Sequence, residues 1–397
     1  MLEGLSEKDA FRRLQALIAE WLRMENVVVL SGAGASVSEG GKTMADLEAS
    51  VLEAVTKCAN LPAEVHKLVQ HRRDDLGHKR AVLGFEGWLS FIVNALHVVS
   101  APGSPLSGVR WAGGCDPSPE AVDWFVQRAS SAIFWECALR LSSDDGKAVA
   151  PHLSFLAKLV ARDSSLGRAH LFTLNYDTLF EQALERLGIQ YFDGFSGRAH
   201  SDFDPSVYGL DIYYPGDVAE GRVRRLDRFL HLYKLHGSIH WRNLKARVVA
   251  HHPDPNTLGR YSALAKPEEK AAFLDKTEPT PIAVLPTANK FAQTLDMPFS
   301  HMFRAFQGRL AVPQTFFLVL GYGFGDAHVN RVIETALTNP SLVLLAVDPC
   351  PDGAVVEWVA NHRGAGKRAF VLTASAVSHA EHPFQKATFQ DFGSFRE

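Results

Sequence analysis

The sequence predicts an α/β fold in which a parallel sheet carries helices on both faces. Residues 27–30 form a short β-branched run of the kind that a fully buried parallel strand shows. After about residue 169, apolar strand-like runs alternate with helical segments. This alternation favours a Rossmann-like parallel sheet.

The expected elements of the sheet follow one another along the chain. Helices are predicted over 177–187, ended by Gly188, and over 327–337. The Gly, Asp, Pro and Arg-rich stretch 195–228 is expected to be an irregular excursion or a hairpin near the site. The segments expected to be strands are 27–30, 169–174, 231–235, 281–285, 315–320 and 341–347.

The N-terminal segment 6–24 is predicted to be an amphipathic helix, with Ser6 and Asp9 in capping-box spacing. Its apolar stripe either packs on its own domain or serves contacts with another subunit or a partner. The residues of this stripe are Leu14, Leu17, Ile18, Trp21 and Leu22.

A mostly helical insertion is expected over about 45–165. Apolar residues recur at helical spacing over 44–100, and a Pro, Gly and Ser-rich loop follows over 101–119. Ser118 and Pro119 then open a helix that runs to about Leu141. The chain is therefore divided into a helix at 1–24 and one large domain at 25–397 that carries the insertion.

Composition indicates a globular chain of a reducing compartment. The 41 basic and 44 acidic residues give a net charge of -3, so no direct nucleic-acid binding is expected. A charged N-terminus and the lack of a long apolar run argue against a signal segment and a membrane segment. The cysteines Cys58, Cys115, Cys137 and Cys350 form no CxxC pair, so neither a disulfide framework nor a zinc site is expected. This cysteine pattern predicts a location in the reducing cytoplasm.

The first candidate site is the loop Gly32-Ala33-Gly34-Ala35-Ser36, which directly follows the first strand. Glycines let the backbone turn tightly and approach a pyrophosphate, which the next helix N-terminus stabilises, and Ser36 adds a hydroxyl donor. The third glycine of the usual fingerprint is missing, so a plain turn between strand and helix stays open.

Polar residues follow the next two strands. Asn175 can hold a ribose hydroxyl or an attacking water, while Asp177 is either a site acid or the cap of the next helix. His236 is a candidate general base, displayed at a strand end. His240 has helical spacing from His236, but Gly237 between them argues against the helix that a zinc pair would need.

A second Gly-rich loop, residues 321–326 with the sequence GYGFGD, follows the strand at 315–320. It is expected to wall the same pocket. Asp348 stands at another strand end, where ribose-binding acids often lie. An ordinary turn remains the alternative for each.

With these segments in this order, the chain resembles the sirtuin superfamily, and more closely the sirtuin-like NAD hydrolases of bacterial antiphage defence systems. The matching segments are GAGAS at 32–36, TLNYD at 173–177, KLHGS at 234–238 and GYGFGD at 321–326, with AVLPTANK at 283–290 as a further family element. The resemblance covers about residues 25–350.

The resemblance implies NAD as substrate and no metal. The catalytic residues that it assigns are Asn175, His236 and Asp177, the last beside the nicotinamide ribose. The residues that it assigns to NAD contacts are Gly32, Ala33, Gly34, Ser36, Thr173, Ser238, Gly321, Tyr322 and Asp348.

Two departures from the protein deacetylases of this superfamily favour water over acetyl-lysine as the acceptor. Their zinc-binding quartet of cysteines is absent, and residues 37–42 lack their Pro-Asp-Phe-Arg element. The expected activity is therefore NAD hydrolysis to nicotinamide and ADP-ribose. A protein deacylase is one alternative, and a non-catalytic NAD or ADP-ribose sensor that acts through assembly is another.

The resemblance also implies restraint of a toxic activity. By family analogy we expect an antiphage effector that forms a homo-oligomer and pairs with a regulatory protein such as a HerA-type ATPase. Residues 1–24 and the helical insertion are the expected assembly surfaces if they are not fully covered within the monomer, and no membrane contact is expected.

Overall fold

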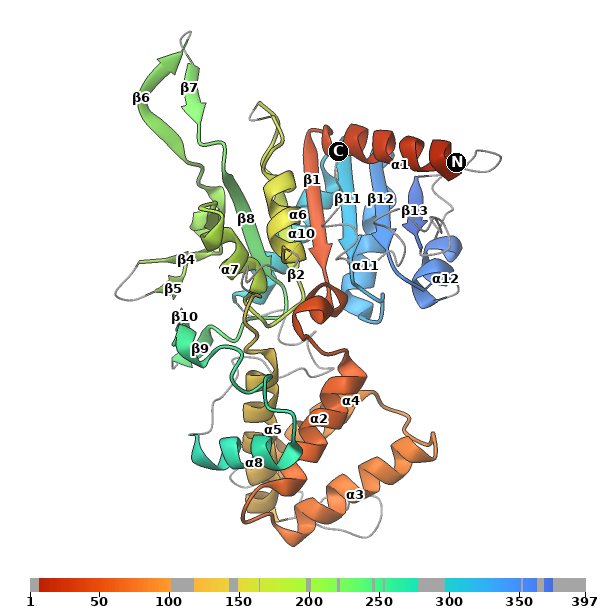
Figure 1. Cartoon of the computed structure of the whole chain (residues 1–397), viewed down its shortest axis with the longest axis vertical. Helices are drawn as coiled ribbons and strands as arrows, with labels where there is room; N and C mark the ends of the chain where they lie inside the picture. The colour runs from red at the N-terminus through yellow and green to blue at the C-terminus, as the bar shows by residue number, and fades with distance from the viewer. Residues whose placement is uncertain are drawn as a thin grey trace.

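A seven-stranded sheet forms the centre of the molecule (Figure 1). A computed structural model describes residues 7–100, 118–142, 149–163, 165–197, 201–219, 222–244, 247–252, 254–277, 297–350, 353–362 and 368–373. All neighbouring strands run parallel, in the order β13-β12-β11-β1-β2-β8-β3. They are β1 (Asn26–Ser31), β2 (His170–Thr173), β3 (Gln190–Phe192), β8 (Phe229–Lys234), β11 (Thr315–Leu320), β12 (Leu342–Val347) and β13 (Ala369–Leu372).

The α/β fold predicted from the sequence is confirmed. Five of the expected strands are present as β1, β2, β8, β11 and β12, with ends that differ by no more than two residues. The short outer strands β3 and β13 were not predicted, because their few residues are only partly buried and carry no long apolar run. The strand expected at 281–285 lies outside the described residues.

Alternate side chains of each strand point to opposite faces of the sheet, so both faces are apolar. Helices cover both faces, and this gives the molecule a core on each side of the sheet. In β1, Val27 and Val29 face one core, while Val28 and Leu30 face the other. The first core contains α1 (Glu7–Leu22), α6 (Pro151–Leu159) and α7 (Leu179–Arg186). The second contains α10 (Phe299–Ala311), α11 (Ala327–Ala336) and α12 (Ala354–Asn361).

The apolar stripe of α1 packs on its own domain. Leu14, Leu17, Ile18 and Trp21 are buried in the first core, and the Trp21 ring lies 5.7 Å from that of Phe316 in β11. Of the two readings of this stripe, the structure therefore favours packing within the chain.

A helical unit lies beyond the carboxyl ends of the strands (Figure 1). It has a third core, to which α8 contributes although it lies outside the range 45–165. Conversely, α6 lies inside that range but packs on the sheet. Ser118 caps α5 by accepting from the Ala121 amide, with Pro119 in first position, but the helix ends at Cys137 rather than near Leu141. The unit consists of α2 (Met44–Lys57), α3 (Ala63–Gly77), α4 (Phe85–Ser100), α5 (Pro119–Cys137) and α8 (Pro267–Lys276).

A buried carboxylate, Glu136 of α5, ties this unit together. Its Oε1 accepts from Lys270 Nζ of α8 at 2.7 Å and from Lys42 Nζ at 3.2 Å. The Ser50 hydroxyl of α2 donates to the same oxygen. Because Lys42 follows the first Gly-rich loop, Glu136 links that loop to the helices.

The excursion expected at 195–228 contains a hairpin, but its place differs from the prediction. The hairpin of β6 (Tyr213–Ala219) and β7 (Arg222–Arg225) extends away from the carboxyl ends of the strands (Figure 1). The expectation that this hairpin lies near the site is wrong, because β7 leads into the amino end of β8. The other elements here are β4 (Phe195–Ser196), β5 (Asp202–Phe203), η2 (Pro205–Gly209), β9 (Trp241–Leu244), β10 (Arg247–Ala250) and η3 (Pro255–Thr257).

Within the described ranges, no helix combines the length and apolarity that a bilayer crossing requires. The same part of the chain holds no group of three or more His, Cys, Asp or Glu side chains placed to bind a metal ion. Cys58, Cys137 and Cys350 carry free thiols, and Cys115 lies outside the described residues.

Two stacked histidines within the sheet predict a loss of stability in acid. The rings of His170 and His231 lie 5.1 Å apart, and burial lowers the pKa of His231 to about 4 and that of His170 well below its usual range. The unfolded chain therefore binds more protons below about pH 6.5. Each histidine should remove up to about 1.4 kcal/mol of unfolding free energy per pH unit as the pH falls from 6.5 toward 4.

Denaturant melts of His231→Phe and the native chain at several pH values test this. The difference in unfolding free energy between the two should vary with pH over this window, whereas exposed His66→Phe should track the native chain. A pH-independent difference for His231→Phe would contradict the prediction.

Candidate functional site

The candidate site lies at β1, where the order in which the chain adds strands to the sheet reverses. From β1 the chain proceeds to β2, β3 and β8 on one side, then returns to β11 beside β1 and continues outward. Open α/β sheets bind ligands at such a switch point, beyond the carboxyl ends of the strands. The loops after β1 and β11 flank this point. The first continues into η1 (Ala33–Glu39).

The pairing of β1, β2, β8 and β11 aligns their carboxyl ends, so the segments that follow β2 and β8 lie at the same edge of the sheet as the Gly-rich loops. Ser31 of β1 pairs with Leu320 of β11 and with Thr173 of β2, and Thr173 pairs with Lys234 of β8. Asn175 and His236 each lie two residues beyond these paired positions. Both therefore lie at the edge where Gly32 and Gly321 begin the Gly-rich loops.

The two Gly-rich loops touch through their backbones. A Cβ on Gly32 would lie 2.7 Å from the Gly321 carbonyl oxygen, and one on Gly34 would lie 2.8 Å from Gly321 Cα. Gly321 itself has a φ of +63°, which favours glycine. The Gly34 amide donates to the Gly321 carbonyl at 2.9 Å. These glycines are therefore required for contact between the loops, whatever ligand they approach.

Asn175, Ser36 and Asp177 form one buried hydrogen-bond chain. Asn175 Nδ2 donates to the Gly32 carbonyl at 3.0 Å and to Ser36 Oγ at 2.8 Å. Ser36 Oγ in turn donates to Asp177 Oδ2 at 2.6 Å. With the Asn175 nitrogen engaged in this way, its Oδ1 is the atom suited to accept from a substrate hydroxyl or water.

Asp177 supports both this hydrogen-bond chain and the start of α7. Its Oδ1 accepts from the Leu179 amide at 3.1 Å, so α7 starts at Leu179 rather than at Asp177 as predicted. Lys234 Nζ donates to the Asp177 carbonyl and to Glu181 Oε1, the latter at 2.8 Å. Burial raises the pKa of Glu181, and Lys234 opposes that shift.

His236 lies against an acid that the sequence did not single out, Asp326. Its Nε2 is 3.2 Å from Asp326 Oδ2, and the two side chains are 8% and 13% exposed. Asp326 is the N-cap of α11 and ends the GYGFGD segment. Its position directly before a predicted helix is the sequence signal that could have identified it.

Loop residues of the site also enter the core of the helical unit. Tyr176 and Ile239 are both buried there. Burial raises the pKa of Tyr176 well above its usual range, and the nearby carboxylates of Glu86 and Asp326 raise it further. Glu86, in the first turn of α4, therefore lies near Tyr176, a neighbour from the helical unit that the sequence did not indicate.

Of the other predicted site residues, Asp348 and Ser238 form hydrogen bonds within local turns. Asp348 Oδ1 accepts from the Cys350 amide at 2.8 Å, and Ser238 Oγ accepts from the His240 amide at 3.2 Å. Thr173 Oγ1 accepts from the Asn175 amide, which helps to orient that residue. Ala33 is exposed. The segment 283–290 lies outside the described residues.

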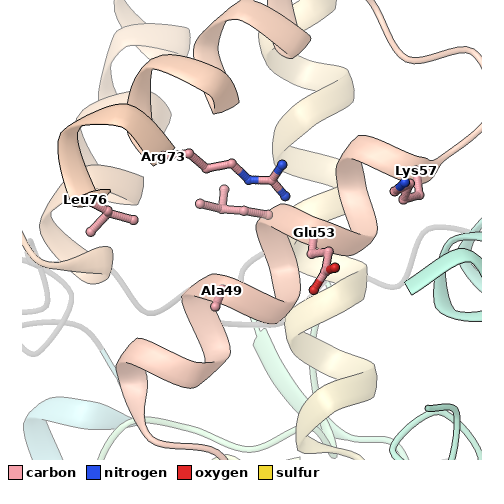
Figure 2. Close-up of a pocket in the computed structure, with 6 residues that line it drawn as sticks. Ala49, Glu53, Lys57, Arg73 and Leu76 are labelled. Atoms are coloured by element: carbon pink, nitrogen blue, oxygen red, sulfur yellow. The ribbon is translucent and has the colours of Figure 1, made fainter. Parts of the chain in front are cut away.

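A cavity of about 500 Å³ lies elsewhere, between α2 and α3 (Figure 2). Glu53, Lys57 and Arg73 bring mixed charges to its wall, beside aliphatic carbon from Ala49, Leu52 and Leu76. None of the motif residues lines it.

The parallel sheet, the switch point and its Gly-rich loops define a Rossmann-like α/β protein. Within it, residues 169–365 match the SIR2-like domain. This match supports a place in the sirtuin-like superfamily, whose SIR2-like members are NAD-dependent enzymes, and it indicates an NAD-related function. Comparison with curated proteins gives no significant match. The first strand and its loop precede the matched range, and the sheet brings them to it.

The loop contact predicts that Gly32→Ala is destabilising. The new Cβ would collide with backbone atoms of Gly321 and Tyr322, which cannot rotate away. We expect a loss of about 1–3 kcal/mol in unfolding free energy, the usual cost of overpacking. Denaturant unfolding measures it.

Gly323→Ala is the matched control, because a Cβ there meets nothing within 4 Å. It should leave the unfolding free energy within about 0.5 kcal/mol of the native value, as expected for a site without special constraint. Equal stability of the two variants would show that the loop contact is not required.

Proposed function

We propose that the chain is an NAD hydrolase that cleaves the bond between nicotinamide and ribose. The observation that supports this proposal is the pairing of β2 with β8 and of β2 with β1, which brings the segments that carry Asn175 and His236 to the edge of the sheet where the first Gly-rich loop begins. The SIR2-like match supports NAD as the substrate.

In the proposed reaction, the bond between ribose C1′ and the pyridinium nitrogen breaks, and its electron pair stays on nicotinamide. Asn175 Oδ1 holds the attacking water or a ribose hydroxyl in place. Water forms the new bond to C1′ and loses a proton to His236, giving ADP-ribose. His236 suits this task because imidazole accepts a proton near neutral pH.

Ser36 and Asp177 are proposed to hold Asn175 in position for this reaction. Their hydrogen bonds hold the Asn175 amide in one orientation. We assign Asp177 to positioning rather than to contact with the reacting atoms, because both of its carboxylate oxygens accept hydrogen bonds within the protein. Gly32, Gly34 and the start of η1 are proposed to receive the phosphates.

Water is the proposed acceptor because the chain lacks the cysteine quartet and the Pro-Asp-Phe-Arg element of the deacetylases. Incubation with NAD, with and without an acylated peptide, tests this choice. Free ADP-ribose in both reactions is expected. Acyl transfer to ADP-ribose would instead identify a deacylase, and NAD binding without nicotinamide release would identify a sensor.

The proposed cellular role is that of a cytoplasmic antiphage effector, which depletes NAD and is restrained by assembly. A homo-oligomer and a regulatory partner such as a HerA-type ATPase are proposed by family resemblance. Nicotinamide release by the purified chain, measured alone and with the product of a neighbouring gene, tests this. Equal rates under both conditions would argue against regulation by that partner.

Removal of the proposed base should separate binding from turnover. A positioned general base contributes typically about 10²- to 10⁴-fold, so His236→Ala should lower kcat by that order. NAD affinity, measured by calorimetry, should change little. The control is His252→Ala, an exposed ring that contacts His240. Unchanged turnover in His236→Ala would remove His236 from the mechanism.

Replacement of the amide should affect both rate and fold. Asn175→Ala removes the donor to Ser36 Oγ and one of two donors to the Gly32 carbonyl, which keeps the Ala35 amide. The loss of these buried hydrogen bonds should cost about 1–3 kcal/mol of stability. Turnover should also fall sharply, since nothing then orients the nucleophile. Thermal unfolding and nicotinamide release measure the two effects. A stable variant with native turnover would refute both roles.

A further inference from the structure

We propose that Asp326 is the positioning residue for His236, which orients the ring and fixes the proton on the nitrogen that faces the carboxylate. This inference rests on the proposed function for its catalytic meaning. The contact itself is independent of any substrate. It joins two segments, KLHGS and GYGFGD, that are about 90 residues apart in the chain.

The carboxylate of Asp326 is divided between two tasks. Oδ1 accepts from the amides of His328 at 2.9 Å and Val329 at 3.4 Å, which anchors it at the N-terminus of α11. Oδ2 lies 3.2 Å from His236 Nε2. Because the helix cap fixes one oxygen, the other is held toward the ring.

Hydrogen bonds among Tyr322, Phe324, Asp326 and Asn330 stabilise the loop that carries Asp326. Tyr322 OH accepts from the Asp326 amide at 3.1 Å and lies 2.9 Å from Asn330 Oδ1, to which it can donate. Asn330 Nδ2 donates to the Phe324 carbonyl at 2.7 Å. Since β11 and β8 are separated by β1 and β2, the loop after β11 has to reach across the ends of two strands to bring Asp326 to His236.

The contact with Asp326 determines which nitrogen of the His236 ring is free to accept a proton. A neutral ring donates from one nitrogen and accepts at the other. With the proton on Nε2 beside Asp326, Nδ1 is the nitrogen that takes a proton from water or a ribose hydroxyl. The carboxylate then stabilises the imidazolium, as an acid behind a catalytic histidine does in other hydrolases.

Other titratable groups face the same region. Glu86 and Asp326 both raise the pKa values of Tyr176 and Tyr322, beyond the effect of burial, so the two carboxylates lie near these rings. Lys234 lies two residues before His236 and pairs with Glu181. Glu86→Gln is therefore a necessary comparison for any change in the His236 titration.

Nitrogen NMR of histidine-labelled protein without substrate tests the contact directly. The His236 signal among 17 histidines is assigned by its loss in His236→Gln. We expect a protonated Nε2 in the neutral ring of the native chain. In Asp326→Asn the His236 pKa should fall by about 1 unit or more, because the opposite charge is lost. Unchanged tautomer and titration would overturn the proposal.

Kinetics test the catalytic consequence. Asparagine also caps helices well, so Asp326→Asn should retain α11. We expect kcat to fall by about 10- to 10²-fold, part of what a general base contributes, with unchanged NAD affinity and an acid limb of kcat/KM displaced to lower pH. The control Asp204→Asn changes an equivalent cap, at η2, and should behave as the native chain.

The NMR and kinetic experiments distinguish failure of the proposed function from failure of the positioning role of Asp326. If the native chain releases no nicotinamide under any condition, the proposed function fails, while the NMR result still decides whether Asp326 orients His236. If the native chain turns over NAD and Asp326→Asn matches it in rate and pH profile, Asp326 is only a helix cap and the positioning role is refuted.

Discussion

The backbone contact between the loops after β1 and β11 is the constraint on which the candidate site depends. Gly32, Gly34 and Gly321 approach more closely than any side chain would allow. This contact lies at the switch point, where η1 begins at Ala33. It also sets Ser36 against Asn175 and holds the base of the GYGFGD loop, whose far end brings Asp326 to His236.

The helical unit is part of the site's construction rather than a separate appendage. Tyr176 and Ile239, from the loops after β2 and β8, are buried in its core. Glu136 connects Lys42, which follows the first Gly-rich loop, to α2 and α8. Movement of these helices would therefore be transmitted to the loops that carry Asn175 and His236.

Much of the architecture could be predicted because buried parallel strands leave a local signal. The runs at β1, β11 and β12 are almost wholly apolar, and Ser118 with Pro119 marks the start of α5. The place of the β6–β7 hairpin could not be predicted, because it depends on which end of β8 the chain enters. The division of α6 and α8 between two cores likewise depends on contacts between distant segments.

The sequence by itself determined the α/β class and the Gly-rich loops, and it proposed Asn175 and His236 as site residues, because strand patterns and strand-end residues are local properties. Only the tertiary structure decided what these residues contact. It showed that the glycines serve a contact between loops, that both Asp177 oxygens are engaged within the protein, and that Asp326 lies beside His236. The physical reason is register: pairings between Ser31, Thr173 and Lys234 join positions far apart in the chain, and no local pattern encodes them.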